Sequence, residues 1–243
     1  MTENLIEIFS SAQGEGPYIG RRQVFVRFEG CNLHCRYCDT AHGVGSRPAC
    51  SVETLRSGVP EIFVQNPVSD EEAAKHILCL LDAAPHHSVS FTGGEPLLHA
   101  DFIAAVAERI PARIFLETNG TLADELKKVI SNVDIVSMDV KPPSAAGETL
   151  WACHRAFLET AAAKDVYVKL VATADLTEDE MDESCRLIAG VRADIPLILQ
   201  PVTPYGGCVP PEAGELLRMQ ERALRVLRDV RLIPQAHGMM GIR

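Results

Sequence analysis

The chain has 243 residues, of which 47% are hydrophobic and 23% charged, as in ordinary globular proteins rather than disordered or fibrous ones. Its net charge of −10 leaves no general basic surface for nucleic-acid phosphates, which excludes DNA or RNA binding as the main function. This length predicts one large α/β domain. Because no apolar run approaches the roughly 20 residues that span a bilayer, and because the first residues lack signal-peptide features, we expect a cytoplasmic protein with no membrane association.

The first half of the chain combines short strands with loops. A predicted strand at 5–9 leads into a loop with two glycines and a proline, and a second at 23–28 leads directly into a cysteine-rich loop. Glycines and prolines interrupt residues 41–67, where we expect an irregular insertion. A helix should then begin at Ser69, because Ser69 and Glu72 have capping-box spacing.

From residue 88 onward, strand-like and helix-like segments alternate. Strands are predicted at 88–91, 113–117, 134–139, 166–171, 196–200 and 230–233, and helices at 101–109, 123–130, 150–162, 178–188 and 212–227. The alternation predicts a parallel sheet with right-handed crossovers, a fold that binds ligands beyond the carboxyl ends of its strands. Polar motifs follow most of these strands, so we expect one rim to collect them. The apolar C-terminal segment 234–243 should pack against the body.

Three cysteines, Cys31, Cys35 and Cys38, lie within eight residues. An odd number of neighbouring cysteines cannot all form local disulfides, so metal ligation is the better interpretation. A structural zinc site needs four ligands, typically with a second pair downstream, and the chain has no such pair. A 4Fe-4S cluster held by only three thiolates keeps one iron open for chemistry. A zinc site completed by His34 or His42 is the alternative.

Two features beside the cysteines allow both a structural and a functional interpretation. The loop after the first strand reads locally as an ordinary connection, although Gly14 and Gly16 would let the backbone approach a ligand recognised by Gln13 or Glu15. Arg27 would ordinarily be a solvated strand charge, yet here it could pair with a substrate carboxylate.

Several motifs together resemble the 7-carboxy-7-deazaguanine synthases of the radical S-adenosylmethionine (SAM) superfamily. They are Ser11 to Gly16, Phe25 to Leu33, Cys38 to Thr40, Thr92 to Pro96, Glu117 to Gly120, Asp139 to Lys141, Gln200 to Val202 and Pro234 to His237. The resemblance implies a single radical SAM domain over 1–243, an α/β fold with a partial (β/α) barrel and a parallel sheet. Residues 41–67 are the part that does not align.

The resemblance also implies a reaction. A 4Fe-4S cluster and SAM would supply a 5′-deoxyadenosyl radical that removes a hydrogen from 6-carboxy-5,6,7,8-tetrahydropterin. Ring contraction with loss of ammonia would then give 7-carboxy-7-deazaguanine for queuosine or 7-deazapurine biosynthesis. Such enzymes regenerate SAM, require Mg²⁺, receive electrons from a donor such as flavodoxin or ferredoxin, and form homodimers.

Site residues follow from the resemblance by position. Those implied for the cluster are Cys31, Cys35 and Cys38, and Thr40 for Mg²⁺. Those implied for SAM are Tyr37, Cys38, Asp39, Gly93, Gly94, Glu95, Ser137, Met138, Asp139, Gln200, Pro201 and Val202. Those implied for the pterin are Ala12, Gln13, Gly14, Glu15, Arg27, Thr92 and the terminal carboxylate of Arg243. No protein side chain is assigned as the catalytic group, because the radical comes from the cofactor.

Two alternatives remain at this point. A glycyl-radical-enzyme activase shares the cysteine spacing and the size, but the Gln-Gly-Glu-Gly loop at 13–16 and the packed tail argue against it. A zinc-stabilised interaction module would have no use for glycine motifs at strand ends.

Overall fold

The computed structural model describes residues 1–38, 47–56 and 59–242. The strands are β1 (Thr2–Glu3), β2 (Leu5–Ala12), β3 (Arg22–Phe28), β4 (Ala49–Arg56), β5 (Val59–Gln65), β6 (Val68–Ser69), β7 (Ser88–Gly93), β8 (Ile114–Thr118), β9 (Ile135–Val140), β10 (Asp165–Ala172), β11 (Leu197–Pro201) and β12 (Val230–Leu232). The helices are α1 (Asp70–Ala83), α2 (Ala100–Ala107), α3 (Ala123–Val129), α4 (Pro143–Ala146), α5 (Trp151–Ala161), α6 (Glu178–Val191), α7 (Ala213–Leu224) and α8 (Ala236–Met240), with short 3₁₀ turns at Gly16–Tyr18, Pro96–His99 and Ile130–Asn132.

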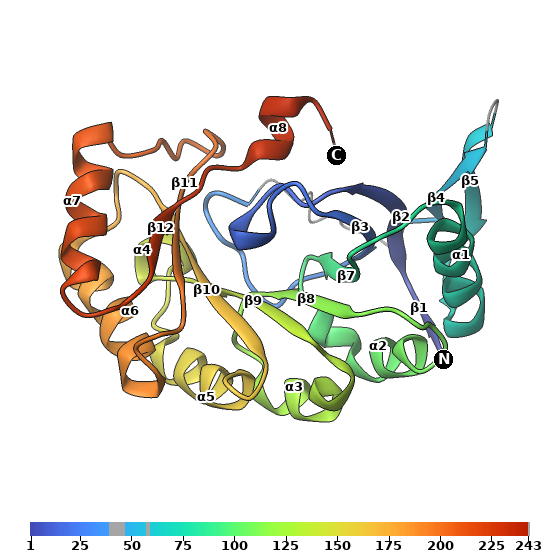
Figure 1. Ribbon diagram of the computed structural model, residues 1–243, viewed down its shortest axis with the longest axis horizontal. Coiled ribbons are helices and arrows are strands. Elements are labelled where there is room, and N and C mark those ends of the chain that lie inside the picture. The colour runs from blue at the N-terminus through green and yellow to red at the C-terminus, as the bar shows by residue number, and fades with distance from the viewer. Residues whose placement is uncertain (39–46, 57–58, 243) are drawn as a thin grey trace.

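One ten-stranded sheet runs in the order β12-β11-β10-β9-β8-β7-β3-β2-β4-β5, and β1 pairs separately with β6. The strands from β3 through β7 to β12 are parallel, which confirms the predicted β–α alternation. Figure 1 shows the sheet curved, with α2, α3 and α5 side by side along its outer face. Within the described residues the edge strands β5 and β12 do not pair, so the barrel is open.

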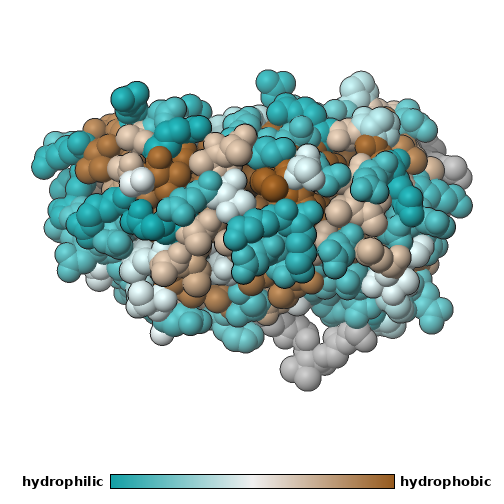
Figure 2. Space-filling model, turned by 90° about the horizontal axis from the view of Figure 1, so that it is seen from below, coloured by the Kyte–Doolittle hydropathy of each residue, from teal (hydrophilic) through white to brown (hydrophobic). Residues whose placement is uncertain are grey.

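The main hydrophobic core lies between the sheet and these helices. Central strands contribute buried side chains such as Phe91, Leu116 and Val136, as parallel strands covered by helices require. Figure 2 shows that the outer face formed by the helices is mostly hydrophilic, with smaller hydrophobic areas between. A capping box between Thr177 and Glu180 begins α6, as the sequence predicts. No helix among the described residues is long and apolar enough to cross a membrane.

The expectation of an irregular insertion at 41–67 is wrong for most of that segment. Its described residues form the antiparallel hairpin of β4 and β5, which extends the sheet through β2. Cys50 and Val52 of β4 are buried, whereas Ile62 and Phe63 of β5 stay 37% and 75% exposed. Because β5 is an edge strand, no buried face imposes a regular alternation on it, and the usual strand signal is missing.

Candidate active site

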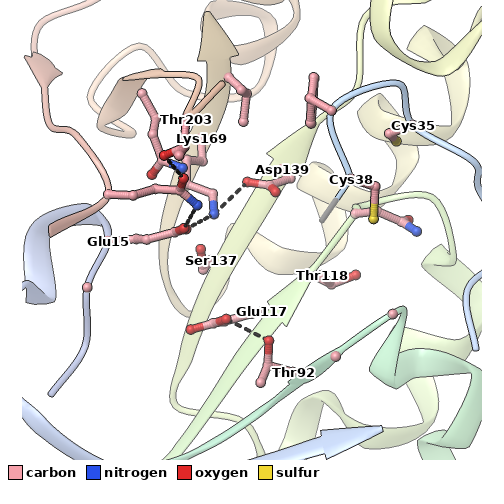
Figure 3. Close-up of a pocket in the computed structure, with 18 of the residues that line it drawn as sticks. Glu15, Cys35, Cys38, Thr92, Glu117, Thr118, Ser137, Asp139, Lys169 and Thr203 are labelled. Atoms are coloured by element: carbon pink, nitrogen blue, oxygen red, sulfur yellow. Dashed lines mark hydrogen bonds and ion pairs between the residues drawn. The ribbon is translucent and has the colours of Figure 1, made fainter. Parts of the chain in front are cut away.

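A cavity of about 360 Å³ opens at the carboxyl ends of the parallel strands. Residues from β2, β3, β7, β8, β9, β10 and β11 line it, together with the loops that follow these strands. Figure 3 shows Cys35 and Cys38 on one side of the cavity and Glu15 and Thr203 on the opposite side. The expected single rim of strand-end motifs is therefore present.

The cysteine loop leaves β3 through Gly30, whose φ of +87° favours glycine. Cys31, Cys35 and Cys38 all line the cavity and are partly exposed. The backbone N–H of Leu33 donates to Sγ of Cys31 over 3.4 Å. Burial raises the pKa of the Cys31 and Cys35 thiols. Thiolates at these positions therefore need a cationic partner, which a metal centre would provide.

The geometry of the cysteines bears on which metal centre they fit. Zinc ligands must all lie about 2.3 Å from one ion. In the described part of the chain, no three His, Cys, Asp or Glu side chains converge in a way that would hold a single ion. The thiolates of an iron–sulfur cluster bind different irons and need only face one shared volume. Three cysteines facing one cavity fit a cluster.

Gly93 ends β7, and Gly94 follows it, next to the cysteine loop. A Cβ on Gly94 would lie 1.8 Å from the carbonyl oxygen of Gly30, and one on Gly93 would lie 2.3 Å from that of Phe28. Gly93 also has a φ of +129°. The glycines therefore let β7 approach the start of the cysteine loop closely, besides lining the cavity.

Glu95 lies behind the cavity wall and is fully buried. Its carboxylate accepts hydrogen bonds from the backbone N–H groups of Leu97 and Asn119 and from the hydroxyl of Thr118, at 2.8–3.0 Å. Burial raises the pKa of Glu95 to about 7, although these hydrogen bonds favour the ionised carboxylate and act in the opposite direction. Glu95 thus ties the end of β7 to the end of β8.

The loop after β2 forms one polar wall with β7 and β8. Nε2 of Gln13 donates to Glu117 over 2.7 Å. The Thr92 hydroxyl donates to the other oxygen of Glu117 over 2.7 Å, as Figure 3 shows. The backbone N–H of Glu15 donates to Oε1 of Gln13 over 3.0 Å. Glu117 therefore orients both the loop and Thr92.

An ion-pair network links the loop after β2 with β9 and β10. Nζ of Lys169 contacts the carboxylates of Glu15 and Asp139, and Nζ of Lys141 lies 2.8 Å from Asp139. Although burial opposes it, the Lys169 ammonium lowers the pKa of Glu15 to about 2. Burial likewise opposes the charge on Lys169, but Asp139 and Glu15 hold its pKa well above the usual value. Glu15 and Lys169 therefore both stay ionised.

Arg27 stands at an aromatic patch of the cavity. Its Nε lies 2.8 Å from Glu7, and its guanidinium carbon is 5.8 Å from the centre of the Phe9 ring. Phe9 in turn stacks on Phe25 with 5.1 Å between ring centres. A flat ring with an anionic group would find an apolar face and a cation side by side here.

The C-terminal segment closes the cavity from the other side through Gln235 and His237. The expectation that its apolar residues pack against the body is wrong for Met239 and Met240, which are 79% and 52% exposed. The backbone N–H of Ala236 donates to the carbonyl of Gly14, and Nε2 of Gln235 donates to Glu15 over 2.7 Å. Gln235 and His237 both line the cavity. On β11, the buried Gln200 has an Oε1 without a hydrogen-bond partner among the described residues. That oxygen is available to a ligand donor.

Comparison with known proteins adds to this geometry. The family model for the radical SAM superfamily matches residues 25–187. A 7-carboxy-7-deazaguanine synthase of Geobacter sulfurreducens is 44% identical over 98% of this chain and 96% of that protein. One from Archaeoglobus fulgidus is 37% identical over 100% of both chains. The chain belongs to the 7-carboxy-7-deazaguanine synthases.

Solved structures support the fold of this 7-carboxy-7-deazaguanine synthase family member. QueE from Escherichia coli covers 98% of this chain and 95% of its own, with a TM-score of 0.58 at 19% identity. A radical SAM methyltransferase from Sphaerobacter thermophilus covers 88% and 66%, with a TM-score of 0.59 at 15% identity. The expected α/β fold with a partial barrel is confirmed. Family membership argues against both the activase and the zinc-stabilised module.

The structure brings most of the residues implied by the 7-carboxy-7-deazaguanine synthase resemblance to one cavity. Those that line it are Ala12, Gln13, Gly14, Glu15, Arg27, Cys31, Cys35, Tyr37, Cys38, Thr92, Gly93, Gly94, Ser137, Asp139, Gln200 and Val202. Glu95, Met138 and Pro201 do not line it, and Met138 belongs to the hydrophobic core on the other face of β9. Asp39, Thr40 and Arg243 lie outside the described residues.

Several lining residues were not assigned a role from sequence. They are Glu117, Lys141, Lys169, Gln235 and His237. A lysine within the otherwise apolar run of β10 is a signal for a buried ion pair, since a buried charge requires a partner. Glu117 and Gln235 lie within quoted motifs, but their side-chain partners depend on the fold.

Proposed function

We propose that the chain is a radical SAM lyase that converts 6-carboxy-5,6,7,8-tetrahydropterin to 7-carboxy-7-deazaguanine with loss of ammonia. The observation that carries the proposal is the three-cysteine loop at one wall of a polar cavity, in a chain that matches synthases of this name over its whole length. We also propose that residues 1–243 form one radical SAM domain, because the ten-stranded sheet takes in strands from β2 to β12.

The cysteine side of the cavity is proposed to hold the cofactors. Cys31, Cys35 and Cys38 would ligate a 4Fe-4S cluster, with Tyr37, Ser137, Asp139, Gln200 and their neighbours around SAM. The chemistry that the bound pair supplies is generation of a 5′-deoxyadenosyl radical. The fit rests on the three cysteines that face one volume and on the unpartnered Oε1 of Gln200.

The opposite side is proposed to bind the pterin. Gln13, Glu15 and Thr92 present hydrogen-bonding groups at fixed positions, and Phe9 and Phe25 offer an apolar surface to a flat ring. Arg27 would bind the substrate carboxylate, since its guanidinium has N–H donors beyond the Nε that contacts Glu7. The protein's part in the reaction is to orient the pterin and exclude water.

Four further properties belong to this proposal. Mg²⁺ bound at Thr40, delivery of electrons by a flavodoxin or ferredoxin, and a homodimer rest on the family resemblance. A cytoplasmic location rests on the sequence, which has no apolar run long enough to span a bilayer. Mg²⁺ takes hydroxyl, water and substrate oxygens as ligands, which suits a threonine beside a carboxylated substrate. Removal of Mg²⁺ by a chelator should lower activity, and added Mg²⁺ should restore it.

The deciding experiment is anaerobic incubation of reduced, cluster-loaded protein with SAM, Mg²⁺ and the carboxytetrahydropterin, followed by mass spectrometry. We expect 7-carboxy-7-deazaguanine to accumulate beyond the amount of SAM consumed. An intact cluster that yields 5′-deoxyadenosine but no deazaguanine would show that the substrate is wrong.

A further inference from the structure

Lys169 occupies an unusual position in the centre of β10. Its neighbours Val168 and Leu170 are fully buried in the main core, while Lys169 itself points to the cavity and is 7% exposed. The strand register places it directly opposite Asp139 of β9. Burial of an ammonium group is costly without anionic partners, so the partners of Lys169 indicate its role.

Those partners come from two different walls. Glu15 belongs to the loop after β2, on the proposed pterin side, and Asp139 belongs to β9, on the proposed SAM side. Figure 3 shows the three side chains pointing toward one another. Lys169 therefore joins the two halves of the cavity through a hydrogen bond to Glu15 and an ion pair with Asp139.

Each carboxylate also has a second partner. Gln235 donates to Oε1 of Glu15 over 2.7 Å, and Lys141 donates to Oδ2 of Asp139 over 2.8 Å. Lys169 donates a hydrogen bond to the other oxygen of Glu15. Its Nζ lies 3.2 Å from Oδ1 of Asp139 as an ion pair, and Oδ1 makes no hydrogen bond within the described residues. Without Lys169, Glu15 would lose a charged hydrogen bond, and Glu15 and Asp139 would both lose the cation that they share.

We propose that Lys169 is a positioning residue that sets the Glu15 and Asp139 carboxylates for simultaneous binding of pterin and SAM. This inference rests on the proposed function, which assigns the two ligands to the two walls. Lys169 acts through Glu15 and Asp139, and it needs no contact with a reacting atom.

The inference predicts a loss of binding rather than of turnover. Lys169→Met keeps the length of the side chain and removes its charge, so the KM for the pterin should rise about tenfold or more, with a much smaller fall in kcat at saturation. Lys169→Arg keeps the charge and should recover most of the affinity. Lys127→Met, a change at a 61% exposed lysine on α3, is the control and should match the wild type.

A double-mutant cycle tests the route through Glu15. If Lys169 acts on the pterin through Glu15, then Lys169→Met combined with Glu15→Gln should raise KM little more than Glu15→Gln alone. Independent, multiplicative effects would overturn the inference. Iron content and thermal unfolding, measured on the same loaded samples, separate this role from a general loss of fold.

The same kinetic measurements distinguish a failure of this inference from a failure of the proposed function. A wild type that forms no deazaguanine refutes the function itself. A wild type that forms product, with KM values within about twofold for Lys169→Met, overturns only this inference. If Lys169→Met does not fold, Lys169→Gln gives the same comparison, because its amide reaches one carboxylate without supplying charge.

Discussion

Gly14 and His237 lie in such close contact that a Cβ on Gly14 would be 2.2 Å from Nδ1 and 2.7 Å from Cβ of His237. One residue follows β2 near the start of the chain, and the other belongs to α8 near its end. The backbone hydrogen bond from Ala236 to Gly14 fixes the same contact. The C-terminal segment thus forms its side of the cavity only because residue 14 has no side chain.

Substitution Gly14→Ala should displace α8 from the cavity. Because the clash reaches Cβ of His237, rotation of the imidazole cannot relieve it, and we expect a KM for the pterin raised about tenfold with unchanged iron content. Gly238→Ala is the matched control, since a Cβ there meets no atom within 4 Å. Equal KM values for the two variants would contradict the prediction.

Cys35 and Cys50 are predicted to differ sharply in their contribution to iron binding. Anaerobically purified wild type should contain about four irons per chain. Cys35→Ala should abolish both the brown colour and activity, because Cys35 faces the cavity. Cys50→Ala should keep both, because Cys50 is buried in β4 within the core cluster. Iron loss in Cys50→Ala, or one zinc in place of iron, would refute the assignment.

His154 is predicted to make stability depend on pH. It lies fully buried, with Nδ1 3.0 Å from the carbonyl of Gly120 and Nε2 accepting from the N–H of Lys141. Burial lowers its pKa to about 4, below the ordinary 6.5. Between these pH values His154 is protonated in the unfolded chain but not in the folded chain. The free energy of unfolding should therefore fall by up to about 3 kcal/mol as pH decreases from about 6.5 to 4.

The variant His154→Leu isolates this effect. It should lose about 2–4 kcal/mol at pH 7, because a backbone donor and a backbone acceptor are left buried without partners. Chemical unfolding at pH 7 and pH 5 should then show less pH dependence in the variant than in the wild type. Equal pH dependence of the two proteins would mean that other groups control acid stability.

An extension at the C-terminus is predicted to impair substrate binding. If the carboxylate of Arg243 contacts the pterin, as the family resemblance implies, added residues replace that anion with a neutral amide. The KM for the pterin should rise about tenfold or more and return to normal when a protease removes the extension. Unchanged kinetics with the extension in place would remove Arg243 from the site.

Sequence patterns predicted the strands and helices better than they predicted the side-chain contacts between distant residues. The parallel strands from β7 to β12 and their helices follow the predicted periods, because a repeat of apolar residues is a local property of the chain. The hairpin of β4 and β5 was missed because glycines and prolines interrupt that segment and because its outer strand, β5, is an edge strand without a strict alternation. Lys169 was not assigned a role from the sequence, and its partner Glu15 lies 154 residues away.

The sequence by itself determined the three-cysteine loop, the alternation of strands and helices, and the rim where strand-end motifs meet. These depend on residue types and spacing along one segment. Only the tertiary structure decided that Glu95 lies behind the cavity wall, that Met138 faces the core, and that Lys169 bridges Glu15 and Asp139. Those outcomes depend on strand register and close packing between distant segments, where a shift of one residue turns a side chain to the opposite face of the sheet.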